Sequence, residues 1–416
     1  ERSKNTVYPE KGYLLQEKTS GGHSNILKNV GMIKNSGKSR REGRKGWYLP
    51  EVFNIKRFRN LEDFLGDLAQ EKAGLNRAVY KKASVFIFEV DDFIESENHS
   101  FALALRGPVI KNDHLIPNSE FIIPRLRAAA DWLCRIQEPD GNIPPIINSL
   151  TGRSTQIDWP RLAFTACALA EFGKAVGEGK YIQAAEKSFG YLKKYLISDI
   201  QYAISSFELT LAYFGQLSIA LGKIKDMRIA GDKLLERFGA IPFDPITSLQ
   251  IASFFKIFSR SDARFSAPFE NLALDLKKSF EANRKKNSVM NLAVWAELAN
   301  VFSDVDQEFS ETIAEWLKSR QLPNGAFLES TESDFVYTRG TGKIFEVLAL
   351  VPEKNKESIE KVLPWLFSMQ YDEENTFFLS DAIRPVIIGG FRHDYLNQEL
   401  WIDSAAHGIL GGTRLV

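Results

Sequence analysis

A short pattern of Trp, Leu and Gln occurs three times in this chain and limits the folds open to it. In each copy the Gln lies five residues after the Trp; the copies are Trp132-Leu133 with Gln137, Trp316-Leu317 with Gln321, and Trp365-Leu366 with Gln370. A Pro-Asp-Gly or Pro-Asn-Gly turn ends the first two copies, at Gly141 and Gly325, whereas Asp372-Glu373-Glu374-Asn375 follows the third. A repeat at fixed offsets indicates one supersecondary unit that is used several times.

The pattern is typical of the end of a helix. Trp and Leu pack one helix face, and a Gln near the C-terminus can bind backbone groups that the last turn leaves without partners. The Pro and the Gly then stop the helix and turn the chain. Weaker copies near residues 191, 234 and 276 bring the number of units to about six, each long enough for two helices. Units of irregular length without a polar capping repeat favour a closed ring over an open solenoid.

The full pattern from Trp132 to Gly141, Trp-Leu-x-x-x-Gln-x-x-Asp-Gly, resembles the repeat of the α/α-toroid proteins. That group includes terpenoid cyclases, protein prenyltransferase β subunits and, more loosely, six-hairpin glycosidases and polysaccharide lyases. The resemblance implies a mainly α fold, an α/α toroid of about six helical hairpins over residues 121–416. It also implies that the turn after each Gln leads to the N-terminus of an inner helix at the rim of a central cavity. Such rings share little chemistry, so the resemblance predicts architecture rather than activity.

The chain before the repeats differs from them in composition. Residues 1–60 are rich in Lys, Arg, Gly, Ser and Asn without periodicity, which predicts a basic, irregular N-terminal arm. Its basic stretch, 38–45, could bind phosphate, nucleic acid, an acidic polymer or a protein partner, or could lie as a strap on the main domain. Residues 61–120 predict a small mixed α+β segment, with a helix starting after Asn60 and strands at 84–90 and 101–105.

Charge and cysteine content exclude several classes of protein. Lys plus Arg and Asp plus Glu both total 53, so no net field draws the whole chain to nucleic acid. The only cysteines, Cys134 and Cys167, exclude a disulfide framework and a Cys-rich zinc site, and as reduced thiols they suit the cytoplasm. We expect no membrane span, because no apolar run approaches about 18 residues. The chain begins without Met or a signal-like segment, so a removed targeting segment stays open.

The segment after the third repeat carries the densest group of residues suited to acid–base chemistry. His393-Asp394, together with Asp403 and His407, puts two imidazoles and two carboxylates within fifteen residues. Asp403 and His407 are four residues apart, so on a helix they share a face and the carboxylate could orient the imidazole. The pair could equally form half of a metal site, or Asp403 could be a favourable residue at a helix N-terminus and His407 a packing residue.

The other predicted rim segments add carboxylates, aromatic rings and arginines. Paired carboxylates are what glycoside hydrolysis needs, and the predicted catalytic residues are Asp158, Asp334, Asp394, Asp403, His393 and His407. Aromatic rings stack on sugars and guanidinium groups bind acidic ones, so the predicted substrate-binding residues are Arg153, Trp159, Tyr337, Arg339, Arg384, Arg392 and Trp401. No pair of carboxylates can be assigned, because the sequence does not give their separations.

These features predict a carbohydrate-active enzyme, a hydrolase or lyase that acts on a polar, acidic glycan. No cofactor is predicted, and a need for a divalent metal stays open. The first alternative is a non-catalytic ring that binds a partner or scaffolds an assembly through residues 1–60. The second is an isoprenoid cyclase, because Asp91-Asp92-Phe93-Ile94-Glu95 is similar to the acidic motifs of terpene synthases, although a strand-like run precedes it.

Overall fold

The computed structural model describes residues 30–35, 45–48, 61–88, 93–95, 101–103, 119–155, 157–197, 206–238, 244–286, 289–333, 335–373, 375–376, 379–394 and 397–416. The chain divides into two compact units, Glu1–Lys111 and Asn112–Val416. Each unit has its own buried core.

The first unit is built on a small antiparallel sheet. Strands β1 (Val30–Asn35), β2 (Lys45–Trp47) and β3 (Ala83–Phe88) have the order β2-β1-β3. Helix α2 (Leu61–Asp67), the π-helical turn η1 (Leu68–Lys72) and the 3-10 helix η2 (Arg77–Lys82) lie between β2 and β3 in the sequence. Their core is Tyr48, Phe64, Leu68 and Ala69. Strands β4 (Phe93–Glu95) and β5 (Phe101–Leu103) form a separate antiparallel pair.

The prediction of an irregular arm over residues 1–60 is wrong for β1 and β2. These strands form because β1 pairs along its length with β3, from Val30 opposite Phe88 to Asn35 opposite Ala83. Pairing over this sequence distance leaves no local periodicity to detect. The strands predicted at 84–90 and 101–105 are present as β3 and β5. Most of the basic stretch 38–45 lies outside the described residues, as do Asp91 and Asp92.

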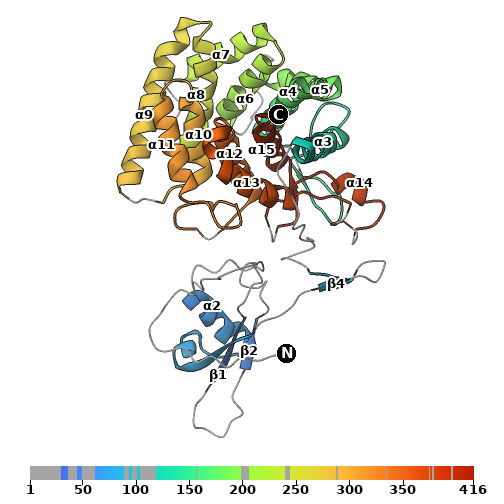
Figure 1. Ribbon diagram of the computed structural model, residues 1–416, viewed down its shortest axis with the longest axis vertical. Helices are drawn as coiled ribbons and strands as arrows, with labels where there is room; N and C mark the ends of the chain where they lie inside the picture. Colours follow the sequence, from blue (N-terminus) through green and yellow to red (C-terminus); the bar gives the residue numbers. More distant parts are fainter. Residues whose placement is uncertain are drawn as a thin grey trace. The chain divides into compact units, whose positions relative to one another are not determined.

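The second unit is an α/α toroid of six helical hairpins, which confirms the predicted fold class (Figure 1). Its outer helices are α3 (Ser119–Ile136), α5 (Gly179–Leu196), α7 (Ile224–Phe238), α9 (Ser266–Lys285), α11 (Gln307–Lys318) and α13 (Pro352–Ser368). Its inner helices are α4 (Trp159–Val176), α6 (Phe207–Ala220), α8 (Pro245–Ser259), α10 (Leu292–Phe302), α12 (Thr338–Leu348) and α15 (Ile402–Thr413). Each inner helix contacts the next, and α15 contacts α4, so the inner ring is closed.

The repeated Gln joins neighbouring outer helices. Its side-chain amide donates to a carbonyl oxygen of the next outer helix in all three copies: Gln137 to Ala184 at 2.8 Å, Gln321 to Ser358 at 2.9 Å and Gln370 to Arg125 at 2.9 Å. The same amide also reaches the carbonyl of the glycine that ends the turn. The Gln therefore binds backbone oxygens that would otherwise lack partners at helix ends and turns.

The third copy has its glycine, but later in the chain than in the other copies. Gly141, Gly325 and Gly389 all have positive φ, at 100°, 91° and 97°. A Cβ on each would lie within 2.3 Å of a carbonyl oxygen of the next outer helix, so only glycine fits there. In the third copy the intervening segment, 371–388, carries the short helix α14 (Arg384–Ile387). This insertion separates Gln370 from the glycine, so the glycine of the third copy is not recognised from its spacing in the sequence.

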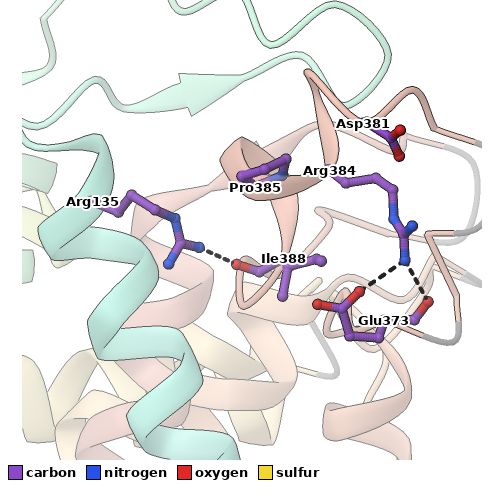
Figure 2. Close-up of a pocket in the computed structure, with 6 residues that line it drawn as sticks. All are labelled: Arg135, Glu373, Asp381, Arg384, Pro385 and Ile388. Atoms are coloured by element: carbon purple, nitrogen blue, oxygen red, sulfur yellow. Dashed lines mark hydrogen bonds and ion pairs between the residues drawn. The ribbon is translucent and has the colours of Figure 1, made fainter.

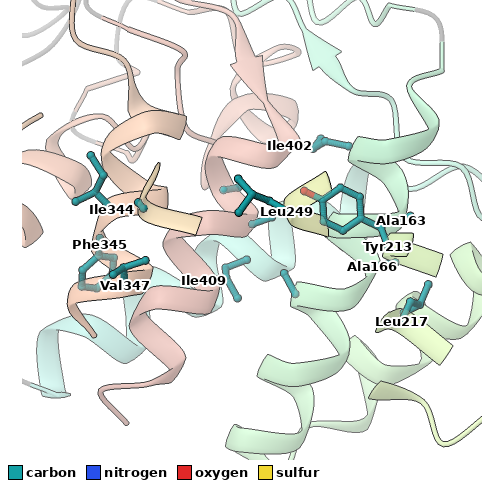
Figure 3. Close-up of a cluster of buried hydrophobic side chains, with 14 of the residues drawn as sticks. Ala163, Ala166, Tyr213, Leu217, Leu249, Ile344, Phe345, Val347, Ile402 and Ile409 are labelled. Atoms are coloured by element: carbon teal, nitrogen blue, oxygen red, sulfur yellow. The ribbon is translucent and has the colours of Figure 1, made fainter. Parts of the chain in front are cut away.

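The apolar core lies between and within the two layers of helices. Inner helices are packed on both sides, so they are apolar around most of their circumference, whereas outer helices expose a polar face. Figure 3 shows side chains of this core from α4, α6, α8, α12 and α15. No helix in the described part of the chain combines the length and apolar character that a membrane crossing needs. Strands β6 (Ile146–Ile147) and β7 (Leu400–Trp401) pair across two loops that precede inner helices.

A polar layer at the centre of the ring as candidate active site

Three inner helices bring their first turns together around one buried carboxylate. Asp403 lies in the first turn of α15, Arg161 in that of α4 and Arg339 in that of α12. Oδ2 of Asp403 accepts from Nε of Arg161 at 3.0 Å and from Nη1 of Arg339 at 3.3 Å. The Asp403 side chain is 5% exposed, whereas those of Arg161 and Arg339 are 21% and 35% exposed. The carboxylate is thus covered, and the two guanidinium groups lie between it and solvent.

The charge state of Asp403 follows from two opposing effects. Burial raises the pKa of its carboxyl, but the adjacent Arg339 and Arg161 lower it, and the net pKa lies below the ordinary value. Asp403 is therefore ionised at neutral pH. An ionised carboxylate held by two guanidinium groups is a poor proton donor, so its geometry suits holding the arginines in place.

Arg161 is held on three sides. Its Nη1 pairs with Oδ2 of Asp158 at 3.1 Å, while Asp158 caps α4 by accepting the backbone N–H of Arg161. Its guanidinium lies over the ring of Trp401, 4.4 Å from the centroid. Cation–π stacking and two carboxylates fix this side chain in one orientation.

The second group of the layer is the imidazole of His393, which lies beside Trp401. Nδ1 of His393 is 2.7 Å from Oδ2 of Asp394, and the His393 ring is 4.1 Å from that of Trp401 and 5.7 Å from that of Tyr337. The backbone fixes the loop, because the His393 N–H donates to Glu399 O and Thr338 N–H donates to His393 O. A carboxylate at Nδ1 leaves Nε2 as the nitrogen that can exchange a proton with a ligand.

The third group of the layer is a buried imidazole–carboxyl pair. Nδ1 of His407 on α15 is 2.9 Å from Oε1 of Glu346 on α12. Burial raises the pKa of Glu346 to about 8, with Arg414 and Lys343 opposing that rise. Burial also lowers the pKa of His407 well below its ordinary value. Both partners are therefore uncharged at neutral pH and share one proton along the hydrogen bond.

Further polar groups extend this layer to the neighbouring inner helices. Lys343 on α12 pairs with Glu297 on α10, and both side chains are largely buried. Phe164 on α4 packs between His407, at 4.4 Å, and Tyr213 on α6, at 5.3 Å. Buried charges are expensive unless they are paired, and a ring that only needed to be stable could carry apolar side chains here. Titratable groups gathered in this way mark a candidate functional site.

The structure brings most predicted residues of the rim together. Asp403, Arg339 and Trp401 are linked through Arg161, which also binds Asp158. The ring of Tyr337 lies beside that of His393, which is hydrogen-bonded to Asp394. Of the alternatives that the sequence leaves open for Asp403 and His407, the structure has Asp403 in the first turn of α15, where it binds the two arginines, while His407 binds Glu346.

Other predicted residues lie away from this layer. Arg392 is buried and donates to Ser368 O and Met369 Sδ at the end of α13. Arg384 pairs with Glu373 on the insertion. Arg153 is exposed on the loop before α4.

Trp159 and Asp334 are the remaining predicted residues. The Trp159 ring stacks against Tyr191 and packs against Tyr195, which covers part of its surface. Asp334 lies outside the described residues.

Sequence reasoning missed Arg161, Lys343, Glu346 and Glu297. A signal for two of them exists, because Arg339, Lys343 and Glu346 are spaced i, i+4, i+7 and share one face of α12. In the described residues no three His, Cys, Asp or Glu side chains are grouped so that they could hold a metal ion.

Comparisons with known proteins agree with the fold. No protein-family model and no curated protein sequence matches the chain. A cellobiose 2-epimerase from Bacillus thermoamylovorans matches with a TM-score of 0.54 and 12% identity, over 71% of this chain and 100% of that one. An alpha-amylase from Clostridium perfringens matches with a TM-score of 0.50 and 12% identity, over 72% and 99% of the two chains. A type II terpene cyclase from Scytonema matches at 0.46 and 13%, over 70% and 97%. At such identity the first two establish an α/α toroid and leave the reaction open.

Proposed function

We propose that the ring is a carbohydrate-active enzyme, a hydrolase or lyase, which binds a polar glycan where the inner helices begin. The observation that supports this most is the pair formed by His407 and Glu346, about one turn along α15 from Asp403. An uncharged, proton-sharing pair with a carboxyl pKa of about 8 can deliver a proton at neutral pH. Trp401, whose side chain is partly exposed, adds an aromatic surface of the kind on which sugar rings stack.

For a hydrolase the proton transfers balance within these residues. Nε2–H of His407 gives its proton to the leaving glycosidic oxygen while Nδ1 takes the proton of Glu346, and the sugar C–O bond breaks. His393, oriented by Asp394, takes a proton from the attacking water through Nε2. Arg161 and Arg339 hold sugar hydroxyls, and Asp403 positions both guanidinium groups. For a lyase His393 would instead take a proton from the sugar carbon next to a carboxylate, the C–O bond on the adjacent carbon would break to leave a C=C bond, and His407 would protonate the leaving oxygen.

The charge of the proposed substrate differs from the sequence-based expectation. The sequence predicts an acidic glycan because it places four arginines at the rim, but Arg384 and Arg392 lie elsewhere. In the polar layer itself the structure has Arg339 and Arg161, of which Arg161 was not predicted. Both arginines are paired with carboxylates, those of Asp403 and Asp158. The balanced charges favour a neutral sugar, and acidic sugars are the second arm of the test.

Turnover on a panel of oligosaccharides tests this function. Wild-type protein is incubated with neutral oligosaccharides of glucose, mannose and galactose and with oligogalacturonate. Reducing ends report hydrolysis, and ultraviolet absorbance of an unsaturated uronate reports elimination. We expect a product from at least one neutral oligosaccharide, and a kcat lowered about 100-fold or more in Glu346→Gln with a small change in KM.

Glu171→Gln is the matched control. Glu171 lies on inner helix α4 but has an exposed side chain paired only loosely with Lys174, at 3.8 Å. Its kcat should stay within about twofold of wild type, since surface changes away from a site have small effects. Absence of any product with wild-type protein, or equal kcat in Glu346→Gln and wild type, contradicts the proposed function.

The non-catalytic alternative receives less support from the same residues. A scaffold ring is expected to have an apolar plug, and the isoprenoid cyclase alternative needs an apolar aromatic cavity. The centre of this ring instead contains the polar pairs Lys343–Glu297 and His407–Glu346, which neither alternative needs. These pairs therefore favour an enzyme that moves protons.

A further inference from the structure

A pocket lies outside the polar layer, on the insertion of the third repeat. It has a volume of about 350 Å³ and is bounded by the C-terminal end of α3, by Glu373 and by residues 381–388 (Figure 2). Its lining consists of Arg135, Glu373, Asp381, Arg384, Pro385 and Ile388. This volume lies at the lower end of the range of about 300–1,000 Å³ for small-molecule sites.

The pocket lies at the same end of the ring as the polar layer. Outer helices α3 and α13 end where inner helices α4 and α15 begin, because consecutive helices of a hairpin are antiparallel. The loop between α3 and α4 has residues near the pocket and residues near the polar layer. Gly152 of this loop is adjacent to Ile383 and Val386, while β6 of the same loop pairs with β7 and so with Trp401.

The charges of the lining are balanced. Nη2 of Arg384 pairs with Oε2 of Glu373 at 2.8 Å, and Nη2 of Arg135 donates to Ile388 O on the other side of the pocket (Figure 2). Asp381 supplies a second, exposed carboxylate. An anion would meet two carboxylates, and a cation would meet two guanidinium groups, so neither has a net attraction to the pocket.

A neutral polyol fits this lining better than either ion. Each sugar hydroxyl both donates and accepts hydrogen bonds, so neighbouring hydroxyls can bind a carboxylate and a guanidinium at once. Pro385 and Ile388 supply an apolar patch for the C–H face of a sugar ring. We propose that this pocket is an outer subsite that binds one neutral sugar unit of a glycan whose cleaved bond lies at the polar layer. This inference rests on the proposed function for the choice of ligand.

Calorimetric titration with neutral oligosaccharides of glucose, mannose and galactose tests the subsite. The Glu373→Gln/Asp381→Asn variant removes both carboxylates of the pocket without changing side-chain size. Trp401→Leu removes the aromatic surface of the polar layer and keeps apolar bulk under Arg161. The experiment compares wild type, each of these variants and their combination, and thermal unfolding checks that all four proteins are folded.

If the outer subsite exists, Trp401→Leu still binds an oligosaccharide, and adding Glu373→Gln/Asp381→Asn weakens that binding about tenfold or more. Equal binding by Trp401→Leu with and without the pocket substitutions overturns the subsite. Loss of all binding in Trp401→Leu, with wild-type affinity in Glu373→Gln/Asp381→Asn, overturns it as well and leaves the proposed function standing. Absence of binding to wild type also overturns the subsite, while the turnover panel decides on the function separately.

Discussion

Gln370 donates a hydrogen bond of 2.9 Å to the carbonyl oxygen of Arg125, although the two residues are 245 positions apart in the sequence. The bond joins the last outer helix, α13, to the first, α3. Nη1 of Arg125 adds an ion pair of 2.8 Å with Asp372, two residues after the Gln. The repeat that joins neighbouring outer helices therefore also closes the ring, because its last copy uses the first helix as its neighbour.

Replacing Gln370 should weaken this closure. Gln370→Ala leaves the carbonyl oxygens of Arg125 and Gly389 without their donor in a buried place, so we expect the free energy of unfolding to fall by about 2–3 kcal/mol. Gln307→Ala is the control, since Gln307 is exposed and its amide binds the partly exposed side chain of Glu311, and it should change stability by less than about 0.5 kcal/mol. Denaturant titration measures both, and equal effects would contradict the closing role.

Gly389 should tolerate no side chain. Its φ is 97°, and a Cβ would lie 2.2 Å from Ala128 O, so Gly389→Ala should lower stability by more than about 1 kcal/mol. Gly190 lies within α5, where an added methyl group would meet open space, so Gly190→Ala should raise stability by about 0.5–1 kcal/mol. Thermal unfolding should shift in opposite directions for the two variants. A shift in the same direction would contradict the need for glycine in the third turn.

Asp403 should matter more for stability than Asp158. Asp403→Asn leaves Arg161 and Arg339 close together without the buried negative charge, and we expect a loss of about 2–4 kcal/mol, moderated by the partial exposure of both arginines. Asp158→Asn keeps the helix cap, because Asn caps as well as Asp, and should cost less than about 1 kcal/mol. Denaturant titration at neutral pH distinguishes them. The reverse order would show that Asp403 does not hold the arginines.

The pKa of Glu346 predicts a pH dependence of stability. In the unfolded chain this carboxyl ionises near pH 4.5, whereas in the folded protein it stays protonated up to about pH 8. A raised folded pKa means that its contribution to stability is complete below pH 4.5 and is lost as the pH rises to about 8. Over this interval the loss amounts to no more than about 5 kcal/mol, at about 1.4 kcal/mol per pH unit.

Glu346→Gln isolates that dependence. The variant cannot ionise, so its free energy of unfolding should fall less steeply than that of wild type between pH 5 and 8. His407 titrates in both proteins and acts in the other direction, since its folded pKa is lowered and stability is lost as pH falls below its ordinary value. The comparison is therefore made between the two proteins at each pH. Parallel stability curves would contradict an uncharged Glu346.

The ring and one end of its centre were predictable because their signals are local. Trp132, Gln137 and Gly141 lie within ten residues, and each does at the helix end what its chemistry suggests. Asp403 follows a repeat, so its place at the rim could also be predicted.

The pairing within the site was not predictable, because it depends on which helices are neighbours. His407 binds Glu346, which is 61 positions away in the sequence, and Asp403 binds Arg161, which is 242 positions away. Arg392 shares a segment with His393 but turns inward to the end of α13, which sequence position alone does not indicate. The same holds for β1, which forms by pairing with β3.

A crystal structure of Glu346→Gln with an oligosaccharide that the wild type converts is the most direct test of the central claim. We predict a sugar ring against Trp401, with a glycosidic oxygen about 3 Å from Nε2 of His407. Hydroxyls of that sugar should lie within hydrogen-bonding distance of Arg161 and Arg339. A sugar bound with its glycosidic oxygens far from both His407 and His393 would contradict the proposed reaction at the centre of the ring.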